Sequence, residues 1–239
     1  MLQRACVAIP VRDEAEKIEH CLRALSAQAG GTPYHVVLLV NNTVDNTIAV
    51  VDRLRPDLGF PVTCVRRDYP PQHAHAGRAR ADAMTVAASI AGPHGVLLTT
   101  DADGQVAPDW LSANLAELAK GVDAVCGRAE IDPVEAQAIP LHLHEDDVRE
   151  IAYGTLLDRI HDLVDPDTFD PWPRHTEHSG ASIAVTVAAW EGVGGVPPVA
   201  AGEDRAFLQA LRRANYRIRH APDVKVTVSG RIIGRAVGG

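Results

Sequence analysis

Two carboxylates, one residue apart, follow an apolar run near the middle of the chain. The stretch LLTTDADGQV, residues 97–106, places Asp101 and Asp103 where a buried strand would end, just before Gly104. Three chemistries use such a pair: a metal ion that holds a nucleotide ligand, a nucleophilic aspartate, and a calcium loop. A solvated turn would contain the same residues. The neighbouring sequence must therefore decide between these interpretations.

The residues around the pair argue against several of these chemistries. A calcium loop needs further oxygen ligands at alternate positions, and Gln105, Ala107 and Trp110 do not supply them. Phosphatases with an aspartyl nucleophile usually carry Thr or Val at the position of Gln105, and their motif follows the first strand. The first apolar run leads into IPVRDE, which has neither the Gly-x-Gly-x-x-Gly of dinucleotide-binding proteins nor the glycine-rich loop of sugar nucleotidyltransferases. An aspartyl-nucleophile phosphatase stays a less favoured alternative.

Composition limits the class of protein and its partners. The chain has 239 residues, 46% of them hydrophobic, and a formal net charge of −8, which argues against a nucleic acid or an anionic membrane as partner. The N-terminal apolar run is too short for a signal peptide, and no run is long enough to cross a bilayer. The four cysteines stand singly, which favours reduced thiols. We therefore expect a soluble, cytoplasmic protein without an integral membrane segment.

Apolar runs and helical patterns alternate through the first 126 residues. Expected strands lie at 5–9, 35–40, 62–65 and 95–100, and expected helices at 14–28, 48–54 and 78–91. Such alternation predicts an α/β fold, with a Rossmann-like, mostly parallel, doubly wound sheet flanked by helices. Ligands bind at the carboxyl ends of such strands. Asn41, Asn42, Asp101 and Asp103 all fall at these ends.

The pattern changes after residue 126. Segments rich in Pro, His and acidic residues surround an expected helix at 150–164. An expected strand leads into a helix at 181–190, and a helix at 201–216 begins near Glu203 and Asp204. No clear linker separates the two parts. We therefore expect one compact domain with two fused halves, 1–126 and 127–239.

Five segments, in order, resemble motifs of the family 2 glycosyltransferases of the GT-A fold. They are VAIPVRDEAEKIEHCLRAL, LLVNNTVDNT, GRARADAM, LLTTDADGQVAPDWL, and the stretch from SGASIAVTVAAW through AGEDRAFLQALRRANYRI. The resemblance covers residues 5 to about 223. It implies an inverting transferase in which residues 1–126 bind a nucleotide-diphosphate sugar and residues 127–239 bind the acceptor and supply the base.

The resemblance also implies a role for individual residues. The nucleotide site would comprise Pro10, Arg12, Glu14, Asn42, Asp45, Arg78, Arg80 and Asp101. Asn42 would face the base, Asp45 would support its turn, and Asp101 would hold the ribose or a metal-bound water. Asp103 would bind Mg²⁺ or Mn²⁺, whose charge stabilises a departing diphosphate. Asp204 would be the general base that deprotonates the acceptor hydroxyl, with Glu203 beside it.

Each of these residues also has a local interpretation. Glu14, Glu203 and Asp204 fit helix starts, where the helix dipole favours acidic side chains. Asn42 fits a helix cap, and Arg78 and Arg80 fit a solvated helix face. The order of the motifs favours the functional interpretation for the Glu203–Asp204 pair.

The chain departs from the family pattern in three places. Asn42 stands where the family usually has an Asp that reads the base. An amide can still pair with a uracil edge, so a UDP-sugar stays favoured, but the preference is weaker than the family motif would give. Positions 227–229 hold Thr227, Val228 and Ser229 where many relatives have a metal-binding histidine, which predicts weak metal binding without nucleotide. The Gln-x-x-Arg-Trp signature of processive synthases is absent. We therefore expect a non-processive enzyme.

The acceptor, a small molecule or a glycan, is less well defined. Trp172, His175 and His178 are weak candidates for contacting it. His142 and His144 have no spacing that fits a closed zinc site. Another class of function stays open as well, namely a protein that binds a nucleotide sugar without turnover.

Overall fold

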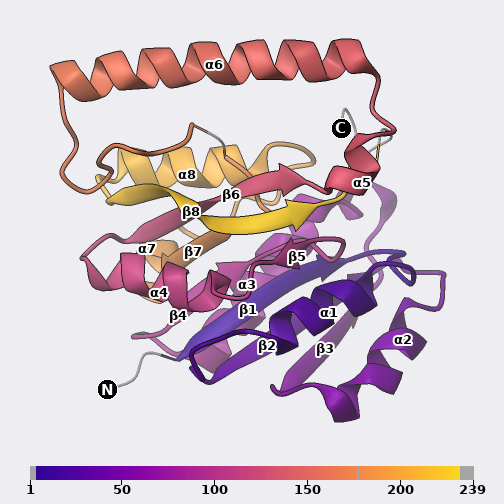
Figure 1. Cartoon of the computed structure of the whole chain (residues 1–239). Coiled ribbons are helices and arrows are strands. Elements are labelled where there is room, and N and C mark those ends of the chain that lie inside the picture. Colours follow the sequence, from indigo (N-terminus) through magenta and orange to yellow (C-terminus); the bar gives the residue numbers. More distant parts are fainter. Residues whose placement is uncertain (1–3, 177, 232–239) are drawn as a thin grey trace.

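A computed structural model describes residues 4–176 and 178–231, and within this part the side chains of residues 141–147 are not described. One eight-stranded sheet, in the order β3-β2-β1-β4-β7-β6-β8-β5, runs through the molecule (Figure 1). Its strands are β1 (Ala5–Val11), β2 (Tyr34–Asn41), β3 (Val62–Arg67), β4 (Val96–Thr99), β5 (Gln105–Val106), β6 (Ala124–Ile131), β7 (Ile183–Thr186) and β8 (Ile218–Val228). The predicted boundary after residue 126 falls inside β6, so strands of both halves share this sheet.

The first half of the sheet is parallel, as the alternating pattern predicts. β1 pairs in parallel with both β2 and β4, and β2 pairs in parallel with β3. The second half is mixed, because β7 lies antiparallel between β4 and β6. β6 pairs in parallel with β8, and the short β5 is antiparallel to β8. The predicted α/β fold is therefore confirmed, with a mixed sheet.

Helices cover both faces of the sheet. The helices are α1 (Ile18–Ser26), α2 (Thr47–Leu54), α3 (Ala76–Ala91), α4 (Trp110–Ala119), α5 (Pro133–Ala136), α6 (Leu141–Val164), α7 (Val187–Gly192) and α8 (Glu203–Arg213), with short 3₁₀ turns at Arg55–Asp57 and Pro71–His73. Alternate strand residues point to opposite faces. Val7 and Ile9 of β1 therefore pack with α1, α2 and α4, whereas Cys6 and Ala8 pack with α3, α7 and α8.

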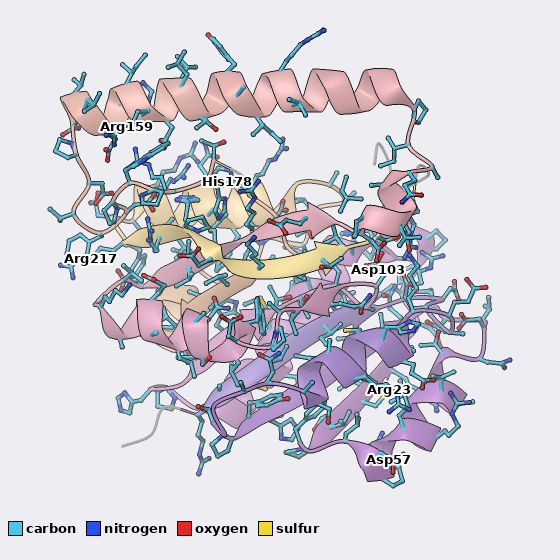
Figure 2. All side chains as sticks on the ribbon, viewed as in Figure 1. Arg23, Asp57, Asp103, Arg159, His178 and Arg217 are labelled. Carbon is cyan, nitrogen blue, oxygen red and sulfur yellow. The ribbon has the colours of Figure 1, made fainter. Side chains whose placement is uncertain are left out.

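The carboxyl ends of β1, β2, β4, β6 and β8 meet at one edge of the sheet, because these strands run in the same direction. Asp103 lies toward this edge in Figure 2, and Arg217, just before β8, lies toward the opposite one. α6 starts at residue 141, nine residues before the predicted helix, and is the outermost element on the side of α8 in Figure 1.

Cys6, Cys21 and Cys126 are buried thiols, and burial raises the pKa of Cys6 and Cys126 to about 12, which keeps them protonated.

Candidate functional site

A cavity of about 360 Å³ lies at the carboxyl ends of β1 and β4. It draws together segments that are far apart in the sequence: the ends of β1, β2, β4 and β8 and the start of α3. Of the residues predicted for the nucleotide and metal sites, those that line it are Pro10, Arg12, Glu14, Arg80, Asp101 and Asp103. The fold thus places six of these nine residues around one hollow.

Arg80 is the buried centre of this site. It lies on α3 with a side-chain exposure of 5%, and its Nη2 is 2.6 Å from Oδ1 of Asp101. Its Nε donates to Oε1 of Glu203 at 3.1 Å, and its Nη1 donates to Oγ1 of Thr99 and to the carbonyl of Gly180, both at 2.8 Å. Burial opposes the charge, but the two carboxylates outweigh it and raise the pKa of Arg80. A buried guanidinium therefore fixes both Asp101 and the start of α8.

Asp101 and Asp103 point to different partners. A turn begins directly after β4, where the amide of Gly104 donates to the carbonyl of Asp101 at 3.1 Å. An extended segment would send both carboxylates to one side, whereas this turn separates them. Asp101 faces Arg80, and Asp103 faces Arg231, whose Nη2 is 2.6 Å from Oδ2 of Asp103.

Arg231 was not singled out by the sequence patterns. It follows β8, and the same nitrogen that binds Asp103 is 3.0 Å and 3.1 Å from the two carboxylate oxygens of Glu14. Residues 227–229, where many relatives have a metal-binding histidine, lie just before it, but no local pattern in the sequence marks Arg231 as a partner of the carboxylates. Lys17 lies nearby and binds Glu135 and Ser229, both at 2.6 Å.

The predicted base lies next to the Arg80 cluster. Oδ2 of Asp204 accepts from the amide of Gly180 at 2.9 Å, and the carbonyl of the same Gly180 accepts from Arg80. A Cβ on Gly180 would lie 2.6 Å from Nη2 of Arg80, so glycine is required for this close approach. The backbone N–H and C=O of one glycine therefore connect Asp204 to Arg80, which lines the cavity.

Three predicted nucleotide residues do not line the cavity. The Asn42 amide group pairs with the backbone of Tyr69, donating at 2.9 Å and accepting at 3.2 Å, and the neighbouring Asn41 lines the cavity instead. Asp45 supports its turn, since its oxygens accept from the amides of Ala15 and Thr47. Arg78 pairs with Asp82, four residues along α3, at 3.1 Å. These three residues therefore have partners within the protein, and their predicted nucleotide contacts stay predictions.

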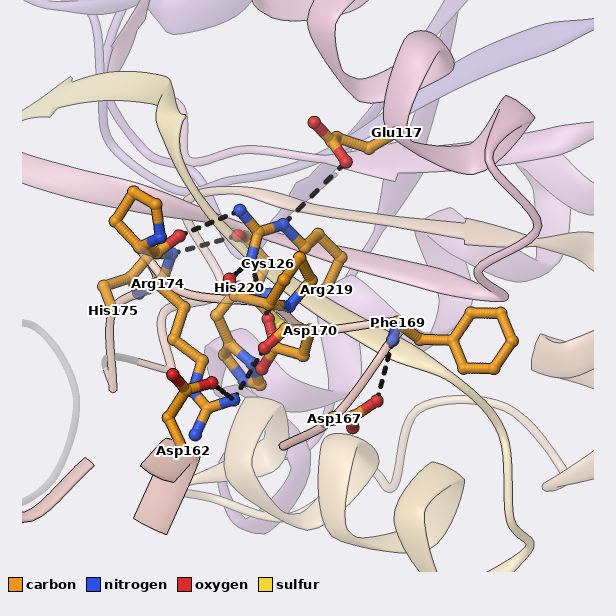
Figure 3. A network of polar contacts seen from close by, with 12 residues as sticks. Glu117, Cys126, Asp162, Asp167, Phe169, Asp170, Arg174, His175, Arg219 and His220 are labelled. Carbon is orange, nitrogen blue, oxygen red and sulfur yellow. Dashed lines mark hydrogen bonds and ion pairs between the residues drawn. The ribbon is translucent and has the colours of Figure 1, made fainter. Parts of the chain in front are cut away.

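The acceptor candidates lie in the second half of the chain, in the segment between α6 and β7. His175 and His178 line a separate hollow of about 670 Å³ together with Asp170 and His220. Figure 3 shows its polar network, in which Nδ1 of His220 is 2.7 Å from Asp170 and Nε2 of His175 donates to the carbonyl of Cys126 at 3.0 Å. Chiefly because of burial, the pKa of His175 and that of His178 fall to about 4, which keeps both rings neutral.

Trp172 does not line this hollow. Its ring lies 5.0 Å from the guanidinium of Arg159 on α6, a cation–π contact that anchors the segment to that helix. Neither His142 nor His144 can be placed, because both side chains fall outside the described residues. Among the described side chains, those of residues 4–140, 148–176 and 178–231, no group of three or more His, Cys, Asp or Glu is arranged to hold a metal ion.

The family model Glycosyl transferase family 2 matches residues 6–172. This chain belongs to that family. The match covers the residues that line the cavity except for those after β8, and it ends before Asp204. None of the curated proteins compared with the chain matches it.

Solved structures of glycosyltransferases are similar to this chain in fold. A mannosyltransferase, PcManGT from Pyrobaculum calidifontis in complex with GDP-Man and Mn²⁺, is 22% identical with a TM-score of 0.62, over 94% of this chain and 56% of that one. TarS 1-349 of S. aureus in complex with UDP is 17% identical with a TM-score of 0.65, over 95% of this chain and 60% of that one. At such identities the likeness shows a GT-A fold, and this chain spans less than two thirds of the length of either structure. Among the described helices, none is both long and apolar enough to cross a membrane.

Proposed function

We propose that this protein transfers a sugar from a nucleotide-diphosphate donor to an acceptor hydroxyl with inversion, without processive extension. The observation that carries the proposal is the Arg80 cluster, which joins Asp101 in the donor cavity to Glu203, and through Gly180 to Asp204. A displacement with inversion needs a single base opposite the leaving diphosphate. Arg80 pairs directly with Asp101 and Glu203 but reaches Asp204 only through Gly180, so Asp204 is the carboxylate of this cluster that the guanidinium does not neutralise directly. Family membership supports the reaction class.

The donor would occupy the cavity around Pro10, Arg12 and Arg80, with its ribose at Asp101. A UDP-sugar is favoured, although the similar structures hold both GDP-Man and UDP. The carboxylates of Asp103 and Glu14 both contact the guanidinium of Arg231, so their oxygens lie close enough together to bind a hard divalent cation. Asp103 would hold Mg²⁺ or Mn²⁺, and the bound ion would stabilise charge on the departing diphosphate. The Mn²⁺ complex of the mannosyltransferase supports a divalent ion of this kind.

Asp204 is suited to take the acceptor proton. Its two oxygens accept from the amides of Gly180 and Arg205, which orients the carboxylate. Each oxygen keeps a second lone pair for the acceptor hydroxyl. Glu203 is held by Arg80 and would position the start of α8, so the proton transfer falls to Asp204. The acceptor, a small molecule or a glycan, would approach past His178 and His175. The reaction would take place in the cytoplasm.

The decisive experiment compares wild type with Asp204→Asn in a panel of nucleotide sugars with Mn²⁺ and candidate acceptors. Loss of a general base lowers turnover by roughly 10²- to 10⁴-fold, while binding of UDP or GDP, measured by calorimetry, should stay unchanged. The exposed Asp223 on β8 provides the matched control, since Asp223→Asn should keep full activity. Proton NMR of the product should show the donor's anomeric configuration inverted.

Other outcomes would favour the rivals. Nucleotide-sugar binding without transfer or donor hydrolysis by wild type would indicate a binding protein. Release of phosphate from simple phosphate esters, with an acyl-phosphate on Asp101, would indicate a phosphatase. A retained anomeric configuration would contradict the role of Asp204 as sole base.

A further inference from the structure

Arg231 supplies positive charge next to two carboxylates of the donor cavity. Its Nη2 lies 2.6 Å from Asp103 and 3.0 Å and 3.1 Å from the two oxygens of Glu14, so one guanidinium neutralises two carboxylates of the donor cavity. The Glu14 side chain is only 10% exposed and that of Asp103 21%. Carboxylates this poorly hydrated and this close need a positive partner.

The two cavity arginines differ in their freedom to move. Arg80 is held by four partners and its side chain is 5% exposed. Arg231 lies beyond the last residue of β8, and its side chain is 26% exposed. It has three partners: one nitrogen binds Asp103 and Glu14, and Nε is 3.4 Å from Oγ of Ser229. Moving Arg231 therefore separates fewer partners than moving Arg80, and its side chain is the more exposed of the two.

A divalent cation and Arg231 compete for the same oxygen. A metal ion bound to Oδ2 of Asp103 would lie within a few ångströms of the guanidinium, and two positive charges at that distance repel strongly. A nucleoside diphosphate brings new negative charge to the same place. The displaced guanidinium has five N–H donors in a geometry that matches phosphate oxygens.

We propose that Arg231 is a donor-binding residue with two positions: it neutralises Asp103 and Glu14 while the cavity is empty, and it pairs with the donor's diphosphate when a divalent cation takes its place on Asp103. This inference rests on the proposed function. It explains physically why metal binding should be weak without nucleotide, since the metal alone must displace an ion pair and gains no phosphate ligand in return.

The test is a pair of calorimetric titrations on wild type and Arg231→Ala. In the first, Mn²⁺ is titrated into nucleotide-free protein, and Arg231→Ala should bind it more tightly than wild type because the competing cation is gone. In the second, UDP and GDP are titrated at saturating Mn²⁺, and the variant should bind them more weakly. Loss of an arginine–phosphate pair lowers affinity by roughly tenfold or more. Opposite changes in the two titrations are the signature of the proposal.

Two further variants control for charge and for folding. Lys225→Ala removes a positive charge from β8, where Lys225 forms an exposed pair with Glu130 at 3.0 Å, and should change neither titration. Arg231→Lys keeps the competing charge, so it should bind Mn²⁺ as weakly as wild type. If Arg231→Ala unfolds, Arg231→Gln takes its place, because it removes the charge while keeping most of the side chain, and unchanged Mn²⁺ binding by it would contradict the competition.

The outcomes separate the inference from the proposed function. If wild type binds neither UDP nor GDP with Mn²⁺, the proposed function is wrong. If wild type binds them but Arg231→Ala leaves either titration unchanged, or weakens both, Arg231 is not a competing, donor-binding cation. The glycosyltransferase proposal would survive that second result.

Discussion

Helices α3 and α6 are the two longest in the structure, and they are held in opposite ways. α3 packs on β1, β2 and β4, with buried residues that are mostly small, such as Ala79, Ala83 and Ala87. α6 carries larger apolar side chains, yet most of those described are exposed, including Leu163 at 70% and Val164 at 79%. Apolar content alone therefore does not decide which helix is buried.

The difference lies in where the apolar side chains stand and what fixes each helix. Small residues let α3 approach the sheet closely, and its one buried charge, Arg80, belongs to the candidate site. On α6, apolar and charged residues alternate around the helix. Polar contacts connect α6 to the segment that follows it: Nε of Arg174 is 2.9 Å from both oxygens of Asp158, and Arg159 makes a cation–π contact with Trp172. α3 is thus positioned by packing, whereas α6 is positioned by charge.

The largest expected effect follows from removing the buried charge of α3. Arg80→Leu leaves the buried Glu203 without its cation and should lower the free energy of unfolding by about 3–5 kcal/mol. On the same helix, Arg78→Ala removes a largely exposed pair with Asp82 and a cation–π contact with Tyr69, and should cost only about 1 kcal/mol. Urea unfolding measures both. A second change, Glu203→Leu, should recover part of the loss in Arg80→Leu, and equal losses in the two single variants would contradict the comparison.

Truncating one large side chain on each helix should give the next largest change in the free energy of unfolding. Met84 on α3 is fully buried, so Met84→Ala should lower the unfolding free energy by about 2–5 kcal/mol. Leu163→Ala on α6 should change it by less than about 0.5 kcal/mol, because the side chain is already exposed. Thermal and urea unfolding decide between these values. A large loss from Leu163→Ala would mean that α6 is packed in solution.

Adding one methyl group should give effects of opposite sign. A Cβ on Gly77 would lie 2.1 Å from the carbonyl oxygen of Val199, so Gly77→Ala should cost about 1–3 kcal/mol through overpacking at the start of α3. A Cβ on Gly154 of α6 would meet only Oγ1 of Thr176, at 3.6 Å. Gly154→Ala should therefore stabilise by about 0.5–1 kcal/mol, since alanine favours a helix interior. Unfolding of the two alanine variants tests the sign, and destabilisation by both would refute the contrast.

The smallest expected effect is a change in how stability depends on pH. The pKa of His178 is lowered to about 4, first by burial and then by the nearby His220, from a model-peptide value near 6.5. Between these two values the unfolded chain binds more protons than the folded one, so the stability that the neutral ring contributes is lost as the pH falls from about 6.5 to about 4. His178→Gln should flatten the fall in melting temperature over this range. The exposed His73 serves as control, and His73→Gln should leave the slope unchanged.

The early part of the fold was predictable from the sequence because its signal is local. A strand of five to eight residues with apolar side chains on both faces, followed by a helical stripe, identifies each βα unit without knowledge of its neighbours. β1, β2, β3, β4 and α3 accordingly lie where the pattern predicts them. The Asp101–Asp103 pair was predictable for the same reason, as it directly follows such a strand. The exposure of α6 was not, because no local pattern tells which other segment covers a helix.

The sequence by itself thus determined the α/β order, the edge of the sheet that holds the cavity and the carboxylates that line it. Only the tertiary structure decided the antiparallel direction of β7, the pairing of Asn42 with the backbone of Tyr69, and the partner of each carboxylate. Arg80 meets Gly180 across 100 positions of the chain, and Arg231 meets Glu14 across 217. The physical reason is that a charged side chain has no periodicity of its own, so its partner depends on which distant segments the packed sheet brings within a few ångströms.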